Sequence, residues 1–166
     1  MTFENKGQVS AEYLLLVGVF VVILMLSLSF IASQHELTMA MAAARNGVTE
    51  GSFYSSSAIY PADTYNEYSK ANYEVLIPSS VEIINISYAD MGYDSKFDKE
   101  KIQFKVYAHS SKEFNKKELD LIGDRINYNL RKSIALTFET TKATNKLYNP
   151  VFSQHYIFTT ANVKWV

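Results

Sequence analysis

The chain contains no cysteine, only three prolines and six glycines, and its lysines and arginines form no run. Without cysteine there can be no disulfide, thiolate metal site or thiol nucleophile, so core packing alone must hold the fold. The formal net charge is −1, and a nucleic-acid-binding protein would normally carry a basic patch. We therefore expect no nucleic-acid partner.

Charge is also missing from one long stretch near the N-terminus. No residue from Tyr13 to Gln34 carries a formal charge, and the stretch shows no strand alternation. As a helix, residues 13–32 would measure about 30 Å, which is enough to cross the hydrocarbon core of a bilayer. Because lipid admits only helices and closed barrels, we predict a membrane-inserting helix.

A single carboxylate, Glu12, precedes this apolar run. An ionised side chain near the lipid boundary is unfavourable unless it is paired or solvated. One interpretation is that a partner cation meets Glu12 only in an assembled state. The other is that Glu12 is a boundary residue solvated among lipid headgroups.

The residues around the end of the short leader are Lys6, Gly7, Gln8, Ser10, Glu12 and Leu16. Together with the apolar run to residue 32, they resemble the class III signal peptide of archaeal type IV pilin-like proteins. Residues 39–47 also resemble methanogen pilin sequences. The resemblance implies that a prepilin peptidase cleaves between Gly7 and Gln8, which makes Glu12 the fifth mature residue. It also implies that the apolar helix becomes the packed core of a filament.

An ordinary secretory signal is the alternative interpretation of the same segment. Its best small-x-small cleavage site is Ser27-Leu28-Ser29. The apolar run is long for such a signal and continues past that site to Ala32, which favours the retained helix.

The helix should continue beyond the membrane. An apolar stripe at spacings of four, three and four residues consists of Leu37, Met41, Ala44 and Val48. This stripe predicts one helix from about residue 9 to about residue 50. Gly47 and Gly51 are expected as stop signals. The predicted divisions are a leader at 1–7, a transmembrane or filament-core helix at 8–32, a helix extension at 33–50 and an extracellular globular domain at 51–166.

Two β-rich runs follow, at residues 81–88 and 101–108, and we predict that they pair antiparallel across a loop at residues 91–94. In the second run, alternation predicts that Ile102, Phe104, Val106 and Ala108 face inward. In the first run, the inward residues are expected to be Ile84, Ile86 and Tyr88, with Asn85 facing solvent.

The C-terminal third predicts a helix followed by strands. Asn115 with Glu118 forms a capping-box pattern before a helix that we expect to end near Ser133. Alternation favours a short strand at residues 134–138 and a closing strand at residues 157–165. The fold class is therefore α+β, in which a small, mainly antiparallel sheet and one covering helix accompany the long N-terminal helix. The pilin resemblance implies a similar arrangement.

Signals for site chemistry are few. Asn85-Ile86-Ser87 matches the N-glycosylation acceptor pattern. Asp90, Asp94 and Asp98 could supply oxygen ligands to Ca²⁺, but they lack the EF-hand pattern, and the three histidines are scattered. We expect no metal site, no cofactor, no catalytic constellation and hence no enzyme.

The resulting hypothesis is a structural subunit of an archaeal surface pilus that serves adhesion. Its expected partners are other copies of the chain, a prepilin peptidase, a pilus assembly platform and, before assembly, the membrane. It would begin as a membrane precursor and end in an extracellular pilus. The alternatives are a solitary membrane-anchored binding or adhesion module that does not polymerise, and an anchored extracellular enzyme.

Overall fold

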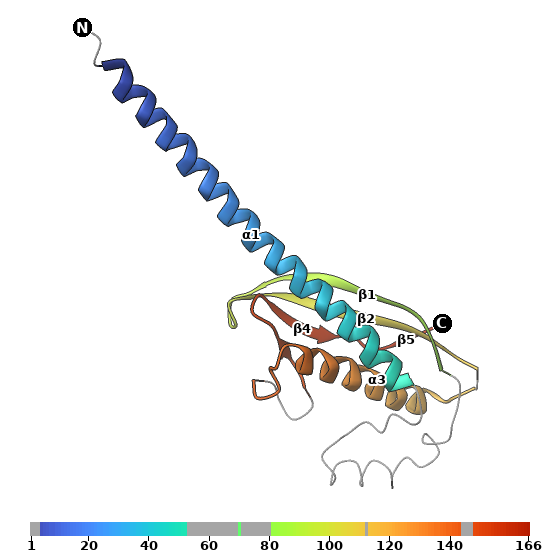
Figure 1. Ribbon diagram of the computed structural model, residues 1–166. Coiled ribbons are helices and arrows are strands. Elements are labelled where there is room, and N and C mark those ends of the chain that lie inside the picture. Colours follow the sequence, from blue (N-terminus) through green and yellow to red (C-terminus); the bar gives the residue numbers. More distant parts are fainter. Residues whose placement is uncertain (1–3, 53–69, 71–80, 112, 144–147) are drawn as a thin grey trace. The chain divides into compact units, whose positions relative to one another are not determined.

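The computed structural model describes residues 4–52, 70, 81–111, 113–143 and 148–166, with side chains from Ser10 onward. The chain divides into two compact units, Met1–Leu37 and Thr38–Val166. Figure 1 shows the order of the elements along the chain. It confirms an α+β arrangement with a long N-terminal helix, a sheet and a second helix.

Helix α1 comprises Glu4–Ser52, which confirms the predicted long helix and extends it by a few residues at each end. Gly47 and Gly51 were expected to stop it, but both lie inside it. The apolar stripe of its last third is only partly as predicted, since Ala44 and Val48 are fully buried whereas Met41 is half-buried. The buried face also contains Ala40 and Ala43.

The sheet is mixed. Strands β1 (Val81–Asp94), β2 (Lys99–Ser110), β3 (Val151–Phe152) and β4 (Tyr156–Thr160) lie in the order β1-β2-β4-β3, and β5 (Lys164–Trp165) also pairs with β2. The β1–β2 and β3–β4 pairs are antiparallel, whereas β4 and β5 both run parallel to β2. The sequence predicted a mainly antiparallel sheet. The observed sheet has two antiparallel and two parallel pairs, and the sequence patterns did not indicate the parallel ones.

The predicted β1–β2 hairpin is confirmed, but its turn lies later than expected. The strand continues through residues 91–94, and the turn occupies residues 95–98, where the Phe97 N–H donates to the Asp94 carbonyl over 3.3 Å. All four residues predicted to face inward from β2 are buried: Ile102, Phe104, Val106 and Ala108.

The inward-facing set predicted for β1 was only partly right. A register shift between Ile83 and Asn85 places Ile84 in a bulge, where its side chain is 52% exposed. Tyr88 lies opposite Phe104 and its ring contacts the Phe104 ring at 6.4 Å, although it remains half-exposed. A bulge adds one residue to a strand. The alternation of inward-facing and outward-facing side chains is therefore interrupted at the bulge.

Helix α3 comprises Lys116–Thr137 and begins with the predicted capping box. The Glu118 N–H donates to Asn115 Oδ1 over 3.0 Å, and the Asn115 N–H donates to Glu118 Oε2 over 2.7 Å. The strand expected at residues 134–138 was wrong, because the helix continues through Thr137. Ile126, Leu130 and Ile134 are all fully buried, so the four-residue helical spacing persists past the predicted end.

The predicted closing strand is divided into β4 and β5 by residues 161–163. The Ala161 N–H still donates to the Phe104 carbonyl over 2.9 Å, and the Val166 N–H donates to the Ala108 carbonyl over 3.0 Å. Ile157 and Phe158 are both buried although they point to opposite faces, which shows that β4 is covered on both sides.

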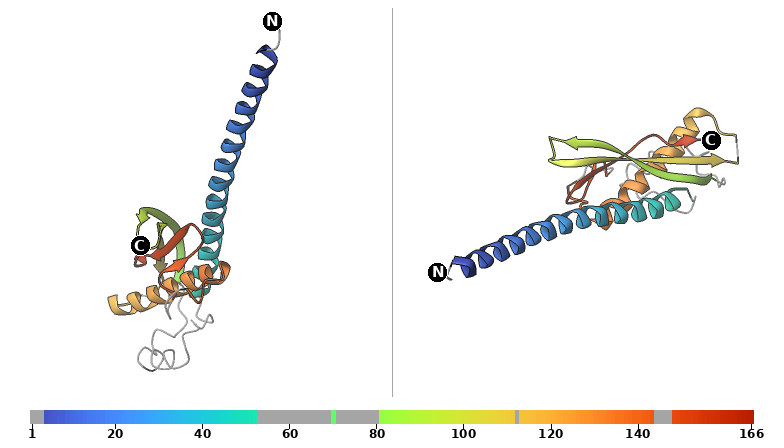
Figure 2. Two further views of the ribbon diagram at one scale, coloured as in Figure 1. Left: turned by 90° about the vertical axis from the view of Figure 1, so that its left-hand side faces the viewer. Right: turned by 90° about the horizontal axis from the view of Figure 1, so that it is seen from above.

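Aromatic rings form the centre of the unit Thr38–Val166, which we call the outer unit. The Phe158 ring lies 5.9 Å from the Phe104 ring, 5.9 Å from the Phe138 ring and 5.8 Å from the Tyr156 ring. This cluster joins β2, β4 and the C-terminal end of α3. Figure 2 shows α3 lying along one face of the sheet. Such a core can hold a cysteine-free domain together by packing.

The segment Thr38–Ser52 of α1 approaches the backbone of α3 very closely. A Cβ added at Gly47 would lie 2.4 Å from the Asn129 carbonyl oxygen, and one at Gly51 would lie 2.8 Å from Ile126 Cα. Arg125 Nε donates to the Gly51 carbonyl over 3.0 Å, which satisfies one of the acceptors left free at the end of α1. Glycine therefore serves close packing between two helices at these positions.

We predict that Gly47→Ala destabilises the outer unit by about 1–3 kcal/mol or more, because the methyl group would collide with backbone that cannot move aside. Urea unfolding of the full chain in detergent, followed by the fluorescence of Trp165, measures this change. Gly18→Ala is the matched control, since an added Cβ there meets nothing within 4 Å. Equal stability of Gly47→Ala and the parent would contradict the close contact.

Burial, together with the neighbouring Tyr148, raises the pKa of Tyr128 from 10.0 to about 12. The folded state therefore favours the neutral phenol, and this contribution to stability is complete below pH 10 and is lost as the pH rises towards 12. We predict that the free energy of unfolding declines over this interval and that Tyr128→Phe makes the decline shallower. Urea unfolding at a series of pH values tests this, and an unchanged slope in Tyr128→Phe would refute it.

Candidate functional site: the processing segment and the apolar helix

The predicted cleavage site lies in the first turns of α1. Gly7 and Gln8 both have helical backbone, and the helix begins only a few residues earlier, at Glu4. Helix ends fray, and peptidases act on backbone that opens locally. Cleavage between Gly7 and Gln8 would therefore require the opening of little more than one turn.

Glu12 lies one turn after Gln8 on the same helix, and its side chain is exposed. No hydrogen bond or ion pair joins it to another residue in the described part of the chain. It is followed by more than twenty residues without formal charge. The carboxylate of Glu12 thus lies at the start of the apolar part of α1, where a group from another molecule can contact it.

Apolar side chains surround α1 on every side from Tyr13 to Ile31. The large ones are between 38% and 70% exposed, and consecutive residues such as Leu14, Leu15 and Leu16 point in different directions around the axis. The helix is long and apolar enough to cross a membrane. A helix that is apolar all round belongs in lipid or among other helices.

Asn85 is exposed on β1, as its predicted solvent-facing position requires. Its neighbour along the sheet is Tyr107 of β2. The side chain is therefore accessible for modification, and glycosylation of Asn85 stays a prediction.

The three aspartates considered for Ca²⁺ use their oxygens locally. Asp90 Oδ1 accepts from the Gly92 N–H over 2.8 Å, Asp94 Oδ1 accepts from the Lys96 N–H over 3.0 Å, and Asp98 accepts from the Tyr93 hydroxyl. Across the described residues, no group of three or more His, Asp or Glu side chains could hold a metal ion. Asp94 and Asp98 thus support the hairpin turn, whereas Asp90 supports the irregular part of β1 before it.

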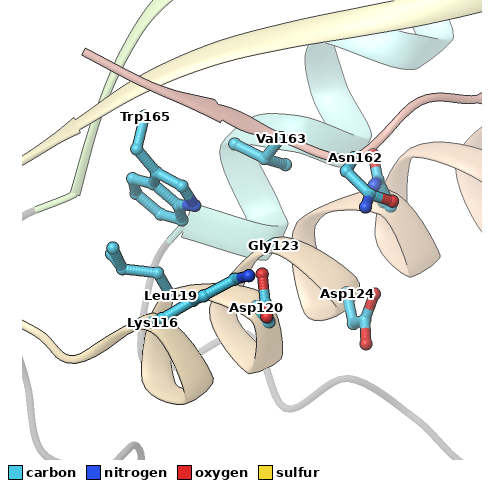
Figure 3. Close-up of a pocket in the computed structure, with 9 residues that line it drawn as sticks. Lys116, Leu119, Asp120, Gly123, Asp124, Asn162, Val163 and Trp165 are labelled. Carbon is cyan, nitrogen blue, oxygen red and sulfur yellow. The ribbon is translucent and has the colours of Figure 1, made fainter.

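A pocket on the outer unit is a feature that the sequence analysis missed. It has a volume of about 360 Å³ and lies between α3 and the C-terminal segment that includes β5 (Figure 3). Its lining consists of Lys116, Leu119, Asp120, Gly123, Asp124, Asn127, Asn162, Val163 and Trp165. The lining residues of α3 follow a helical spacing that is visible in the sequence. Trp165 reaches these residues only because β5 pairs parallel to β2.

Asn127 is the only buried polar residue of this lining, with 5% of its surface exposed. Its Nδ2 donates to the Ala161 carbonyl over 2.9 Å, whereas its buried Oδ1 accepts no hydrogen bond from the described residues. An unpaired buried acceptor of this kind costs about 1–3 kcal/mol. This acceptor is enclosed behind the pocket lining, with less than 1 Å² of accessible surface.

The two carboxylates of the pocket lie one turn apart on α3. Partial desolvation raises the pKa of Asp124 and the charge of Asp120 raises it further, while Arg131 acts in the opposite direction. The pocket thus favours a ligand group that can donate a hydrogen bond to Asp124.

Comparison with known proteins identifies the N-terminal segment. Residues 5–31 match the protein-family model of the class III signal peptide. No curated protein and no solved structure matches the chain. The match and the long apolar helix indicate a type IV pilin-like precursor that a prepilin peptidase processes and that inserts into the membrane.

We predict that membranes containing a prepilin peptidase convert the full chain into a product that begins at Gln8. Gly7→Val should abolish this conversion, because a branched side chain before the scissile bond would obstruct the entry of the backbone. Intact-mass spectrometry measures the loss of residues 1–7. Val9→Ala is the control and should be processed normally; unimpaired cleavage of Gly7→Val would disprove the assignment.

Proposed function

We propose that this chain is a structural, non-enzymatic subunit of an archaeal type IV-like surface pilus, polymerised through α1 and serving adhesion. The observation that carries the proposal is the apolar surface of α1, exposed on every side, within and after the start of a class III signal peptide segment. A surface that is apolar on all sides can be covered first by lipid and then by the same helix of other copies.

The proposed sequence of events begins with insertion of the precursor, with the leader in the cytoplasm and the outer unit outside. Lys6 on the leader agrees with this orientation. Cleavage after Gly7 removes the polar leader and creates an α-amino group at Gln8. An assembly platform then lifts the helix out of the lipid into a bundle of identical helices.

In this bundle Glu12 would pair with the α-amino group of Gln8 in a neighbouring subunit. Glu12 is exposed and has no partner in the described part of its own chain, so its carboxylate is available for such a contact. A charge pair surrounded by apolar side chains is favourable only when its geometry is good. The pair would therefore set the axial register of the subunits in addition to neutralising both charges.

The outer unit would then cover the filament surface. Asn85, exposed on β1, is the proposed glycan acceptor on this surface. Adhesion would depend on side chains of the outer unit, since in the filament the apolar helix would be enclosed.

We predict that Glu12→Gln lowers the amount of protein in sheared surface filaments about ten-fold or more, because the neutral side chain cannot pair with the new amine. Cleavage after Gly7 should continue, so processed protein should accumulate in membranes. Immunoblots of the sheared and membrane fractions measure both quantities. Glu50→Gln, which alters an exposed carboxylate of the same helix, should assemble normally.

Normal filament yield from Glu12→Gln would exclude the assembly role of Glu12. If the parent chain itself stays entirely in membranes after shearing, the solitary anchored module becomes the better interpretation. The two results separate a fault in the Glu12 mechanism from a fault in the filament proposal.

A further inference from the structure

The pocket between α3 and β5 offers more hydrogen-bond acceptors than the fold uses. Asp120 and Asp124 present exposed carboxylates at its rim, and Asn127 keeps an unused acceptor in its buried lining. Asn127 Oδ1 has less than 1 Å² of accessible surface, so the two exposed carboxylates are the acceptors that a ligand in the pocket can reach. A ligand that matches this pocket must carry several donors.

Donors also line the pocket, and they decide between two kinds of ligand. The Lys116 ammonium and the Asn162 amide are exposed at the rim, and Figure 3 shows the ammonium beside the Asp120 carboxylate. An ammonium ligand could satisfy the acceptors, but it would repel Lys116 and could accept nothing from Asn162. Hydroxyl groups both donate and accept, so a polyhydroxylated ligand fits the whole set.

The remaining wall is apolar and aromatic. Figure 3 shows the indole of Trp165 beside Val163 and above Leu119. The C–H groups of a sugar ring form an apolar face that packs on an aromatic ring, while the hydroxyls point outward to polar partners. The volume of about 360 Å³ lies at the small end of ligand-binding sites, which suits one or two sugar rings.

We propose that this pocket binds a neutral saccharide, with a sugar ring against the indole of Trp165 and its hydroxyls bonded to the carboxylates of α3. The biological meaning of this site rests on the proposed adhesive function, for which it supplies a ligand class. Binding itself requires only the folded outer unit. A chain that binds sugar but forms no filaments would refute the pilus and leave this inference intact.

Trp165 is the only tryptophan in the chain, so its fluorescence reports on this site alone. The full chain, purified in dodecylphosphocholine to avoid detergents with sugar headgroups, is titrated with methyl glycosides of glucose, galactose, mannose and N-acetylglucosamine. At least one should give a saturable change with a Kd of about 1 mM or below. Asp124→Ala should weaken that binding about ten-fold, because the ring hydroxyls lose a charged acceptor.

Glu113→Ala is the matched control, since it removes an exposed carboxylate outside the pocket and should leave the Kd unchanged. Urea midpoints equal to that of the parent would show that each variant is folded. The proposal is overturned if none of the four glycosides gives a saturable change, or if both Asp120→Ala and Asp124→Ala bind as the parent does. Tighter binding of propylammonium than of any glycoside would identify a cation site instead.

Discussion

Removal of the apolar surface of α1 from water is the constraint on which the rest depends. Between Tyr13 and Ile31 the helix is apolar on every side, and no other part of the described chain covers it. Lipid can cover it in a precursor, and identical helices can cover it in a filament. The predicted cleavage site at Gly7 and the carboxylate of Glu12 lie at the start of this surface, next to the residues that would pass from lipid into the proposed filament.

Features that depend on neighbouring residues could be predicted from the sequence. The class III segment, the long helix and the capping box of Asn115 and Glu118 are local patterns, and the structure or the family match bears them out. The alternation from Ile102 to Ala108 correctly assigned the inward face of β2 because no bulge interrupts that stretch. Gly7, Gln8 and Glu12 were assigned from their spacing within this segment, and their roles in cleavage and assembly stay predictions.

Features that depend on residues far apart could not be predicted. Residues 134–138 alternate in hydropathy, which is typical of a strand. Ile134 nevertheless completes the buried face of α3, so tertiary packing stabilises the helical conformation there. Gly47 and Gly51 look like stop signals until α3 is known to lie against them. The pocket exists only because β5 pairs parallel to β2 and brings Trp165 to α3, a pairing that no local pattern specifies.

The most direct test of the account is the N-terminal peptide of the native protein, determined by mass spectrometry in sheared surface material and in membranes. The account predicts that the sheared material contains a peptide beginning at Gln8, with or without cyclisation of the glutamine. An intact Met1 found only in membranes would contradict processing and assembly together. A start near Phe30 would show an ordinary signal peptide and would remove the helix on which the filament depends.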